Sequence, residues 1–197
     1  MTEPIEPSPH MDKEGLACFK AALETSRCYL EYGCGGSTVY ACAVAKTPVV
    51  ISVETDNNWL ERVRSSVSQS ASSLLIEHCD IGRVADWGRP VALDRIGDFW
   101  RYMVMPWAIT TRYGHAPDTI LIDGRFRVAA FLYSLLSAPL GATILFDDYF
   151  DRPHYFVVEE FCKPGQRHGR MAVFTVTRDF SMQDIAARIA QYTVDFS

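Results

Sequence analysis

The sequence lacks the features that mark several classes of protein. Its six cysteines form no Cys-x-x-Cys pair, and the acidic, proline-rich start contains no apolar signal core. No apolar run reaches the roughly 18 residues that a membrane-spanning helix needs. These absences argue against a disulfide framework, a zinc site and export, and they predict reduced thiols in a soluble cytoplasmic protein.

The chain also lacks an excess of positive charge, because its formal net charge is −5. Binding of nucleic acid relies on clustered Lys and Arg, so we expect a small-molecule partner and neither nucleic acid nor a membrane. The chain has no Gly-x-Ser-x-Gly elbow, no Walker loop and no His-Glu-x-x-His motif, which leaves hydrolases and ATPases without support. The oligomeric state stays open, a homodimer included.

The 197 residues suit one domain with a single core. Residues 1–10 hold three prolines and little apolar periodicity, which predicts a flexible tail before a single domain at 11–197. Apolar runs and helical spacing alternate along that domain. Strands are expected at 28–32, 48–54, 73–80, 118–124 and 142–146, helices at 11–27, 37–46, 58–69, 127–137, 155–161 and 181–191, and a hairpin at 163–168 and 171–176.

The most informative stretch runs from Cys28 to Thr38, where a short apolar strand ends in an acidic residue and a glycine-rich turn. Such a turn before a helix opens a nucleotide-binding unit, because glycines let backbone approach a ligand closely. A dinucleotide fingerprint needs glycine at its first, third and sixth positions, and the sixth position here is Thr38.

The remaining pattern, with Glu31, Gly33 and Gly35, resembles motif I of the class I S-adenosylmethionine-dependent methyltransferases. The family's usual third glycine falls at Ser37, with Gly36 one position early. The resemblance implies a doubly wound α/β fold, with a mostly parallel seven-stranded sheet, helices on both faces and a C-terminal antiparallel hairpin. It also implies S-adenosylmethionine as cofactor.

Further acidic residues follow the later strands. Glu54 ends the second strand, where a carboxylate can accept the hydroxyls of a ribose, although it could also be a plain surface residue. In the resembling family the residue at Asp80 or its neighbour holds the adenine amino group, and Ile81 would lie on the adenine face. The expected cofactor-binding residues are therefore Glu31, Gly33, Cys34, Gly35, Gly36, Ser37, Glu54, Asp80 and Ile81.

Asp123, Asp147 and Asp148 follow the fourth and fifth strands. This arrangement resembles the magnesium site of metal-dependent O-methyltransferases, and carboxylates are the hard ligands that Mg²⁺ prefers. Many family members carry such acids without a metal. In that case Asp123 or Asp148 could act as general base, with His154 as a third candidate.

Residues 82–117 form a long, aromatic connection that we interpret as a cap over the substrate, with Trp100 and Trp107 in contact with it. The alternative is that these aromatics pack against the sheet or a second copy. Arg125 and Arg152 could hold an anionic substrate, or balance the neighbouring aspartates.

The resulting prediction is S-adenosylmethionine-dependent methyl transfer to a small hydroxylated or acidic molecule, an O-methyltransferase being one option. Two alternatives remain. One is a nicotinamide-dependent oxidoreductase, which would need glycine in place of Thr38. The other is a non-catalytic module that binds S-adenosylmethionine and a protein partner.

Overall fold

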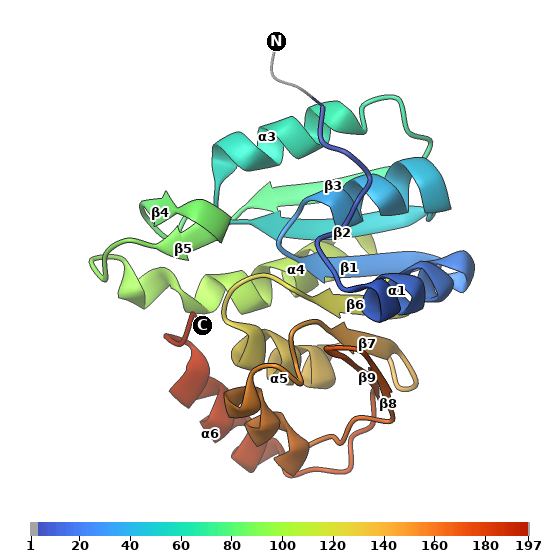
Figure 1. The fold of residues 1–197 in the computed structure, drawn as a ribbon. Helices are drawn as coiled ribbons and strands as arrows, with labels where there is room; N and C mark the ends of the chain where they lie inside the picture. Colours follow the sequence, from blue (N-terminus) through green and yellow to red (C-terminus); the bar gives the residue numbers. More distant parts are fainter. Residues whose placement is uncertain (1–3, 197) are drawn as a thin grey trace.

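A seven-stranded sheet forms the centre of the protein, which we describe from a computed structural model over residues 4–196 (Figure 1). Its strand order is β3-β2-β1-β6-β7-β9-β8. The first five strands in this order are parallel, β9 is antiparallel to β7, and β8 pairs with β9 as the closing hairpin. The expected fold class is confirmed. The strands are β1 (Cys28–Tyr32), β2 (Val49–Glu54), β3 (Ser73–His78), β6 (Thr119–Ile122), β7 (Thr143–Phe146), β8 (Gln166–His168) and β9 (Met171–Thr175).

Helices cover both faces of this sheet (Figure 1). One face packs against α1 (Lys13–Thr25), α2 (Gly36–Val39) with its π-helical continuation η1 (Tyr40–Ala45), and α3 (Asn57–Ser66). The other face packs against α4 (Trp100–Tyr113), α5 (Arg127–Ser137) and α6 (Met182–Tyr192). Within residues 4–196, no helix combines the length and the apolar character needed to cross a bilayer.

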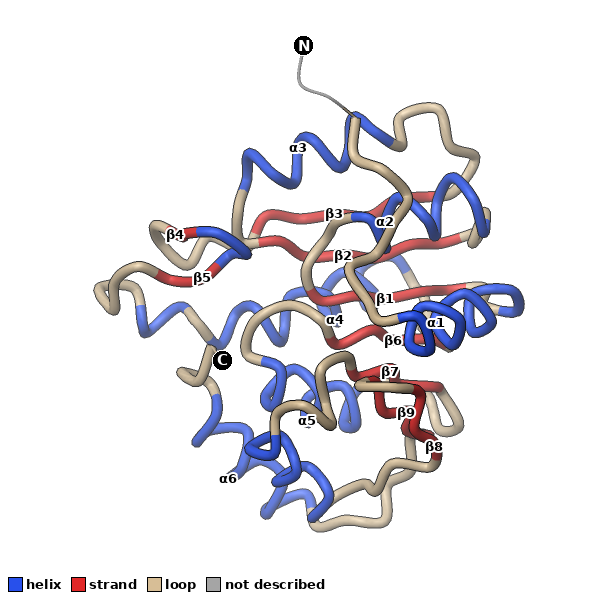
Figure 2. Tube along the Cα trace, viewed as in Figure 1, coloured by secondary structure: helices blue, strands red, loops and turns tan. Residues whose placement is uncertain are grey.

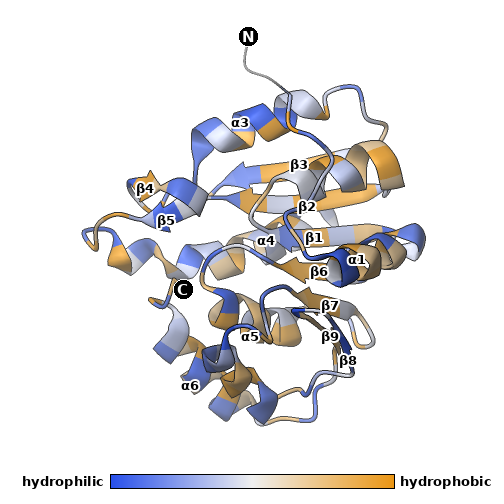
Figure 3. Cartoon of the chain, in the orientation of Figure 1, coloured by the Kyte–Doolittle hydropathy of each residue, from blue (hydrophilic) through white to orange (hydrophobic). Residues whose placement is uncertain are grey.

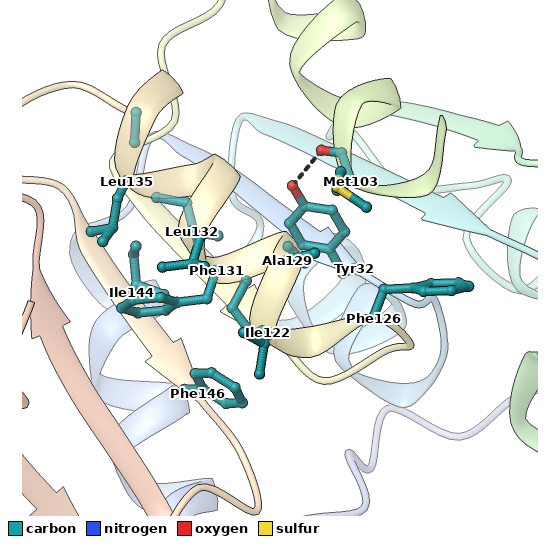
Figure 4. Packing of buried hydrophobic residues seen from close by; sticks show 14 of the residues in the cluster. Tyr32, Met103, Ile122, Phe126, Ala129, Phe131, Leu132, Leu135, Ile144 and Phe146 are labelled. Atoms are coloured by element: carbon teal, nitrogen blue, oxygen red, sulfur yellow. Dashed lines mark hydrogen bonds between the residues drawn. The ribbon is translucent and has the colours of Figure 1, made fainter. Parts of the chain in front are cut away.

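The two faces follow from the alternation of side chains along each strand. In β1, Leu30 and Tyr32 point into the core beneath α4 and α5, whereas Tyr29 lies on the opposite face. Central parallel strands buried on both faces are mostly apolar, and in Figure 3 much of the sheet has the hydrophobic colour. In Figure 4, Phe131 and Leu135 of α5 pack over Ile144 of β7.

Helix ends follow local capping rules. Asp56 caps α3 by accepting from the amides of Asn58 and Trp59, and Ser181 caps α6 by accepting from that of Asp184. All six cysteines are free thiols, as expected.

The segment 82–117, which the sequence predicts to cap the substrate, consists of two parts. Its first part forms a small ribbon of β4 (Val84–Ala85) and β5 (Arg89–Pro90), with short 3₁₀ turns η2 (Asp86–Gly88) and η3 (Ile96–Asp98). Its second part is α4, which covers the sheet and contains Pro106. A proline inside a helix removes one backbone hydrogen bond, at a cost of ~3 kcal/mol. Burial of one face of α4 offsets that cost, so the proline does not end the helix.

Tyr32→Phe tests the junction between β1 and α4. The fully buried Tyr32 hydroxyl donates to the Met103 carbonyl at 2.8 Å and accepts from Trp107 Nε1 at 2.8 Å (Figure 4 shows the first bond). The substitution removes both hydrogen bonds and leaves the buried Trp107 indole N–H without its partner, so we expect the free energy of unfolding to fall by about 1–3 kcal/mol in urea titrations. Tyr113→Phe, on the exposed side of α4, is the control, and an equally small loss in both variants would contradict the stabilising role of these two hydrogen bonds.

Candidate active site

A cavity of about 660 Å³ opens at the edge of the sheet where the parallel strands end. Its volume falls within the range of roughly 300–1,000 Å³ that small-molecule sites occupy. Six segments contribute to its wall: the glycine-rich turn, the end of β2, the end of β6 with the residues that follow, α3, the β4–β5 turn and the N-terminal segment. The lining residues are Ile5, Glu6, Ser8, Pro9, His10, Gly33–Ser37, Glu54, Asp56, Trp59, Arg62, Asp86–Gly88 and Asp123–Arg125.

The glycine-rich turn has a backbone that other residues rarely adopt. Gly33 has a φ of +85°, and a Cβ there would lie 3.1 Å from the Cα of Gly124. A Cβ at Gly124 would in turn lie 2.7 Å from the carbonyl oxygen of Tyr32. The loops after β1 and β6 therefore touch backbone to backbone, which brings Gly33 and Asp123 into one cavity wall.

Gly36 is required for a different reason, because a Cβ there would overlap the backbone carbonyl of Ser8. The N-terminal segment crosses the glycine turn on its way to α1 (Figure 2). Its ends are held by hydrogen bonds from the Ile5 amide to Ser66 Oγ at 2.9 Å and from Arg170 Nη2 to the His10 carbonyl at 2.6 Å.

Sequence reasoning missed this contribution of the N-terminal segment to the cavity wall. The predicted flexible tail spans residues 1–10, of which 1–3 lie outside the described residues. Residues 5–10 make the contacts given above, and their mobility stays a prediction. A proline-rich segment with no apolar periodicity carries no signal of where it docks, and the adjacent glycine pair at 35–36 was the only available sign of a close approach.

Glu31 lies behind the turn and not in the cavity. Its side chain is fully buried, and its carboxylate accepts hydrogen bonds from the hydroxyls of Tyr29 at 2.8 Å, Ser37 at 2.7 Å and Thr38. It is absent from the cavity lining among the described residues, and its contact with the cofactor stays a prediction. Its hydrogen bonds instead fix the start of α2 to the end of β1.

Burial raises the pKa of Glu31 to about 7, while the hydrogen bonds from Thr38, Ser37 and Tyr29 lower it. The protein thus holds this carboxyl group close to the midpoint of its titration near neutral pH.

Glu54 is placed as predicted, at the end of β2 and in the cavity wall. Its Oε1 accepts from the amides of Thr55 at 2.7 Å and Asp56 at 3.0 Å, and its Oε2 accepts from the amide of Cys34 at 3.1 Å. These bonds orient the carboxylate at the turn. They leave acceptor capacity on Oε2 for a ligand, because a carboxylate oxygen has two lone pairs.

Asp80 and Ile81 lie elsewhere than expected. The Asp80 side chain is 54% exposed and accepts from the Gly82 amide and from Arg95, whereas Ile81 is buried in the core beneath α4. Neither is among the described residues that line the cavity. The neighbouring wall comes instead from Asp86–Gly88, in a ribbon whose position could not be predicted from local sequence.

The two tryptophans expected against the substrate are also displaced from the cavity. Trp100 is 50% exposed at the start of α4. Trp107 is 5% exposed and packs between α4 and the sheet, where its Nε1 donates to Tyr32. Helical spacing put Trp107 on the buried face of α4, so the packing alternative is the correct one for this residue. Trp59 and Trp87 line the cavity instead.

Asp123, Asp147 and Asp148 come together as predicted, with a carboxylate oxygen of each within 4.8 Å of the others. Three arginines already pair with them. Arg127 lies 3.1 Å from both Asp123 and Asp148, Arg152 lies 2.9 Å from Asp148, and Arg170 lies 2.7 Å from Asp147 and 3.0 Å from Asp148. A metal ion would have to displace these guanidinium groups, so the residues do not fit the expected Mg²⁺ site.

Of this cluster, Asp123 alone among the described residues lines the cavity. Its side chain is 29% exposed, and desolvation raises its pKa to about 6, although Arg127 lowers it. Asp148, the second candidate base, forms ion pairs with three arginines. One of them is Arg152, which was expected to bind the substrate. His154 lies in η4 (Pro153–Glu160), with its ring 4.3 Å from that of Tyr155 and outside the lining. Asp123 is therefore the candidate base that the geometry retains.

Glu31→Gln tests the buried carboxylate through pH. Because its pKa is raised from 4.5 to about 7, the folded protein retains a proton that the unfolded chain releases between these values. The contribution of Glu31 to stability therefore falls as the pH rises through this window, by roughly 3 kcal/mol. Relative to the wild type, the Gln variant should gain stability between pH 4.5 and 8 in urea unfolding. A pH-independent difference would contradict the assignment, and Glu77→Gln, on an exposed ion pair, is the control.

Comparison with solved structures identifies similar proteins. A methyltransferase-like protein from Silicibacter pomeroyi is 30% identical, with a TM-score of 0.87 over 96% of this chain and 98% of its own. The N-methyltransferase NodS from Bradyrhizobium japonicum, in complex with S-adenosyl-L-homocysteine, is 11% identical, with a TM-score of 0.53 over 83% and 86% of the two chains.

A cofactor-bound protein from MTB, Rv0187, is 18% identical, with a TM-score of 0.55 over 87% of this chain and 83% of its own. No protein-family model matches the sequence, and a comparison with curated proteins finds no match. The glycine turn, the strand order and the relative at 30% identity all indicate the same family. The chain belongs to the class I S-adenosylmethionine-dependent methyltransferase superfamily.

Proposed function

We propose that this protein transfers the methyl group of S-adenosylmethionine to a small hydroxylated or acidic molecule in the cytoplasm, most simply to an oxygen atom. The observation that carries the proposal is the cavity formed where the glycine turn meets Glu54 and Asp123.

The residues of the cavity fit S-adenosylmethionine. Glu54 presents a carboxylate with remaining acceptor capacity, suited to ribose hydroxyls. At Gly35, the nearest atom to an added Cβ is a Trp59 ring carbon at 3.8 Å, so a ligand can approach this backbone. The acidic lining residues Glu6, Glu54, Asp56, Asp86 and Asp123 outnumber the two arginines there, which favours a cationic ligand.

When bound, S-adenosylmethionine supplies an electrophilic methyl group on a positively charged sulfur. The chain's own residues position the acceptor and remove its proton. Asp123 is the proposed general base, because it lines the cavity and burial raises its pKa above the usual range of an aspartate, toward neutral pH. Arg127 holds Asp123 Oδ1 at 3.1 Å, which orients the carboxylate.

Thr38 disfavours the nicotinamide alternative. This residue occupies the sixth position of the fingerprint, where a dinucleotide fold has glycine for close helix–strand packing. Its buried hydroxyl donates to Glu31 and accepts from the Gly35 amide at 2.9 Å. The turn is thus built around a threonine, and the acidic lining would repel a pyrophosphate.

Glu54→Gln tests the cofactor site by calorimetric titration with S-adenosylhomocysteine. Loss of the charged acceptor should weaken binding roughly 10- to 100-fold, because a hydrogen bond to a charged group contributes about 1.5–3 kcal/mol. Glu77→Gln, on β3 and away from the cavity, should bind like the wild type. Unchanged affinity in Glu54→Gln, with thermal unfolding showing an intact fold, would refute the placement of the ribose.

A further inference from the structure

Arginines cluster around the aspartates that follow β6 and β7, and most of them have a carboxylate partner. Arg127, Arg152 and Arg170 pair with the three aspartates that follow β6 and β7, three cations against three anions. Their charges are compensated within the cluster itself.

Arg125 is the exception among these residues. No carboxylate of residues 4–196 forms an ion pair with it, and its Nη1 lies 3.5 Å from the Phe196 carbonyl, at the outer limit of a hydrogen bond. Its buried Nε has no hydrogen-bond partner in the same residues. A guanidinium group has five N–H donors, and leaving them unpaired while partly buried is unfavourable.

Arg62, the other arginine in the cavity wall, likewise forms no ion pair and has a buried Nε without a hydrogen-bond partner among residues 4–196, but it has an aromatic partner. Its guanidinium group lies over the Trp59 ring, 5.0 Å from the centroid, which is a favourable cation–π contact. Arg125 makes no such ring contact with the described part of the chain. Arg125 is therefore the cavity cation that is best disposed to receive an anion from outside the chain.

Its electrostatic surroundings agree with this interpretation. Burial lowers the pKa of Arg125, and the positive charges of Arg127 and Arg152 lower it further. An anion bound at this position would offset both effects.

We propose that Arg125 binds the carboxylate of the methyl acceptor, and that the acceptor is a small hydroxy acid. This inference rests on the proposed function of the same cavity. The planar guanidinium fork matches a carboxylate in bidentate geometry. Asp123, two positions earlier and in the same wall, then takes the proton of the acceptor hydroxyl as its oxygen bonds to the methyl carbon and the sulfur–methyl bond breaks. The sulfur leaves as a neutral thioether.

The carboxylate could also be that of the cofactor's own methionine portion, so the test separates the two sources. The first measurement is calorimetric titration of S-adenosylhomocysteine into the wild type, Arg125→Gln and Arg112→Gln. Arg112 pairs with Glu77 on the surface and provides the matched charge change away from the cavity. Equal affinities in all three proteins are expected. A loss of affinity of about tenfold in Arg125→Gln alone would assign the carboxylate to the cofactor and overturn the proposal.

The second measurement is methyl transfer from radiolabelled S-adenosylmethionine to hydroxybenzoates and lactate, each compared with its neutral amide. The wild type and Arg112→Gln should prefer at least one acid over its amide by about tenfold or more in kcat/KM, and Arg125→Gln should lose that preference. The proposal is overturned if no acid is preferred, or if Arg125→Gln keeps the preference. Absence of S-adenosylhomocysteine binding to the wild type would instead refute the proposed function.

Discussion

A buried carboxylate behind a glycine turn is the constraint on which the site depends. Glu31 has no access to solvent, and three hydroxyl groups from β1 and the start of α2 donate to it. An isolated charge in such surroundings would be strongly destabilising, and the hydroxyl groups reduce that penalty. The result is a turn whose backbone faces the cavity while its supporting side chains face the core.

The acidic residues at the strand ends consequently divide into two groups. Glu31, Asp147 and Asp148 are engaged by hydroxyl or guanidinium groups and serve the fold. Glu54 and Asp123 are each held by neighbours yet line the cavity. The same edge of the sheet thus holds two kinds of carboxylate. Those of the first group stabilise the loops, whereas those of the second group can still accept hydrogen bonds from a ligand.

The sequence was sufficient for the strands and most helices, because burial on both sheet faces imposes long apolar runs and α5 has strong helical spacing. It was sufficient for the position of Glu54 as well, since the ends of parallel strands share one edge. It misplaced Trp107, which packs between α4 and the sheet and donates to Tyr32, a contact between residues 75 positions apart. It also suggested a metal site at the three aspartates. The arginines that pair with these aspartates were not foreseen, because Arg170, for example, lies 23 positions from Asp147 and meets it only in the folded structure. Sequence spacing contains no record of such contacts.

Hydrogen–deuterium exchange with and without S-adenosylmethionine tests the central claim most directly, because it locates the bound ligand on the chain. We predict slower amide exchange in peptides covering residues 31–38 and 52–59, no change in α6, and no effect of NAD⁺ at the same concentration. Protection by NAD⁺, or protection by S-adenosylmethionine confined to regions outside these peptides, would contradict the proposed cofactor site.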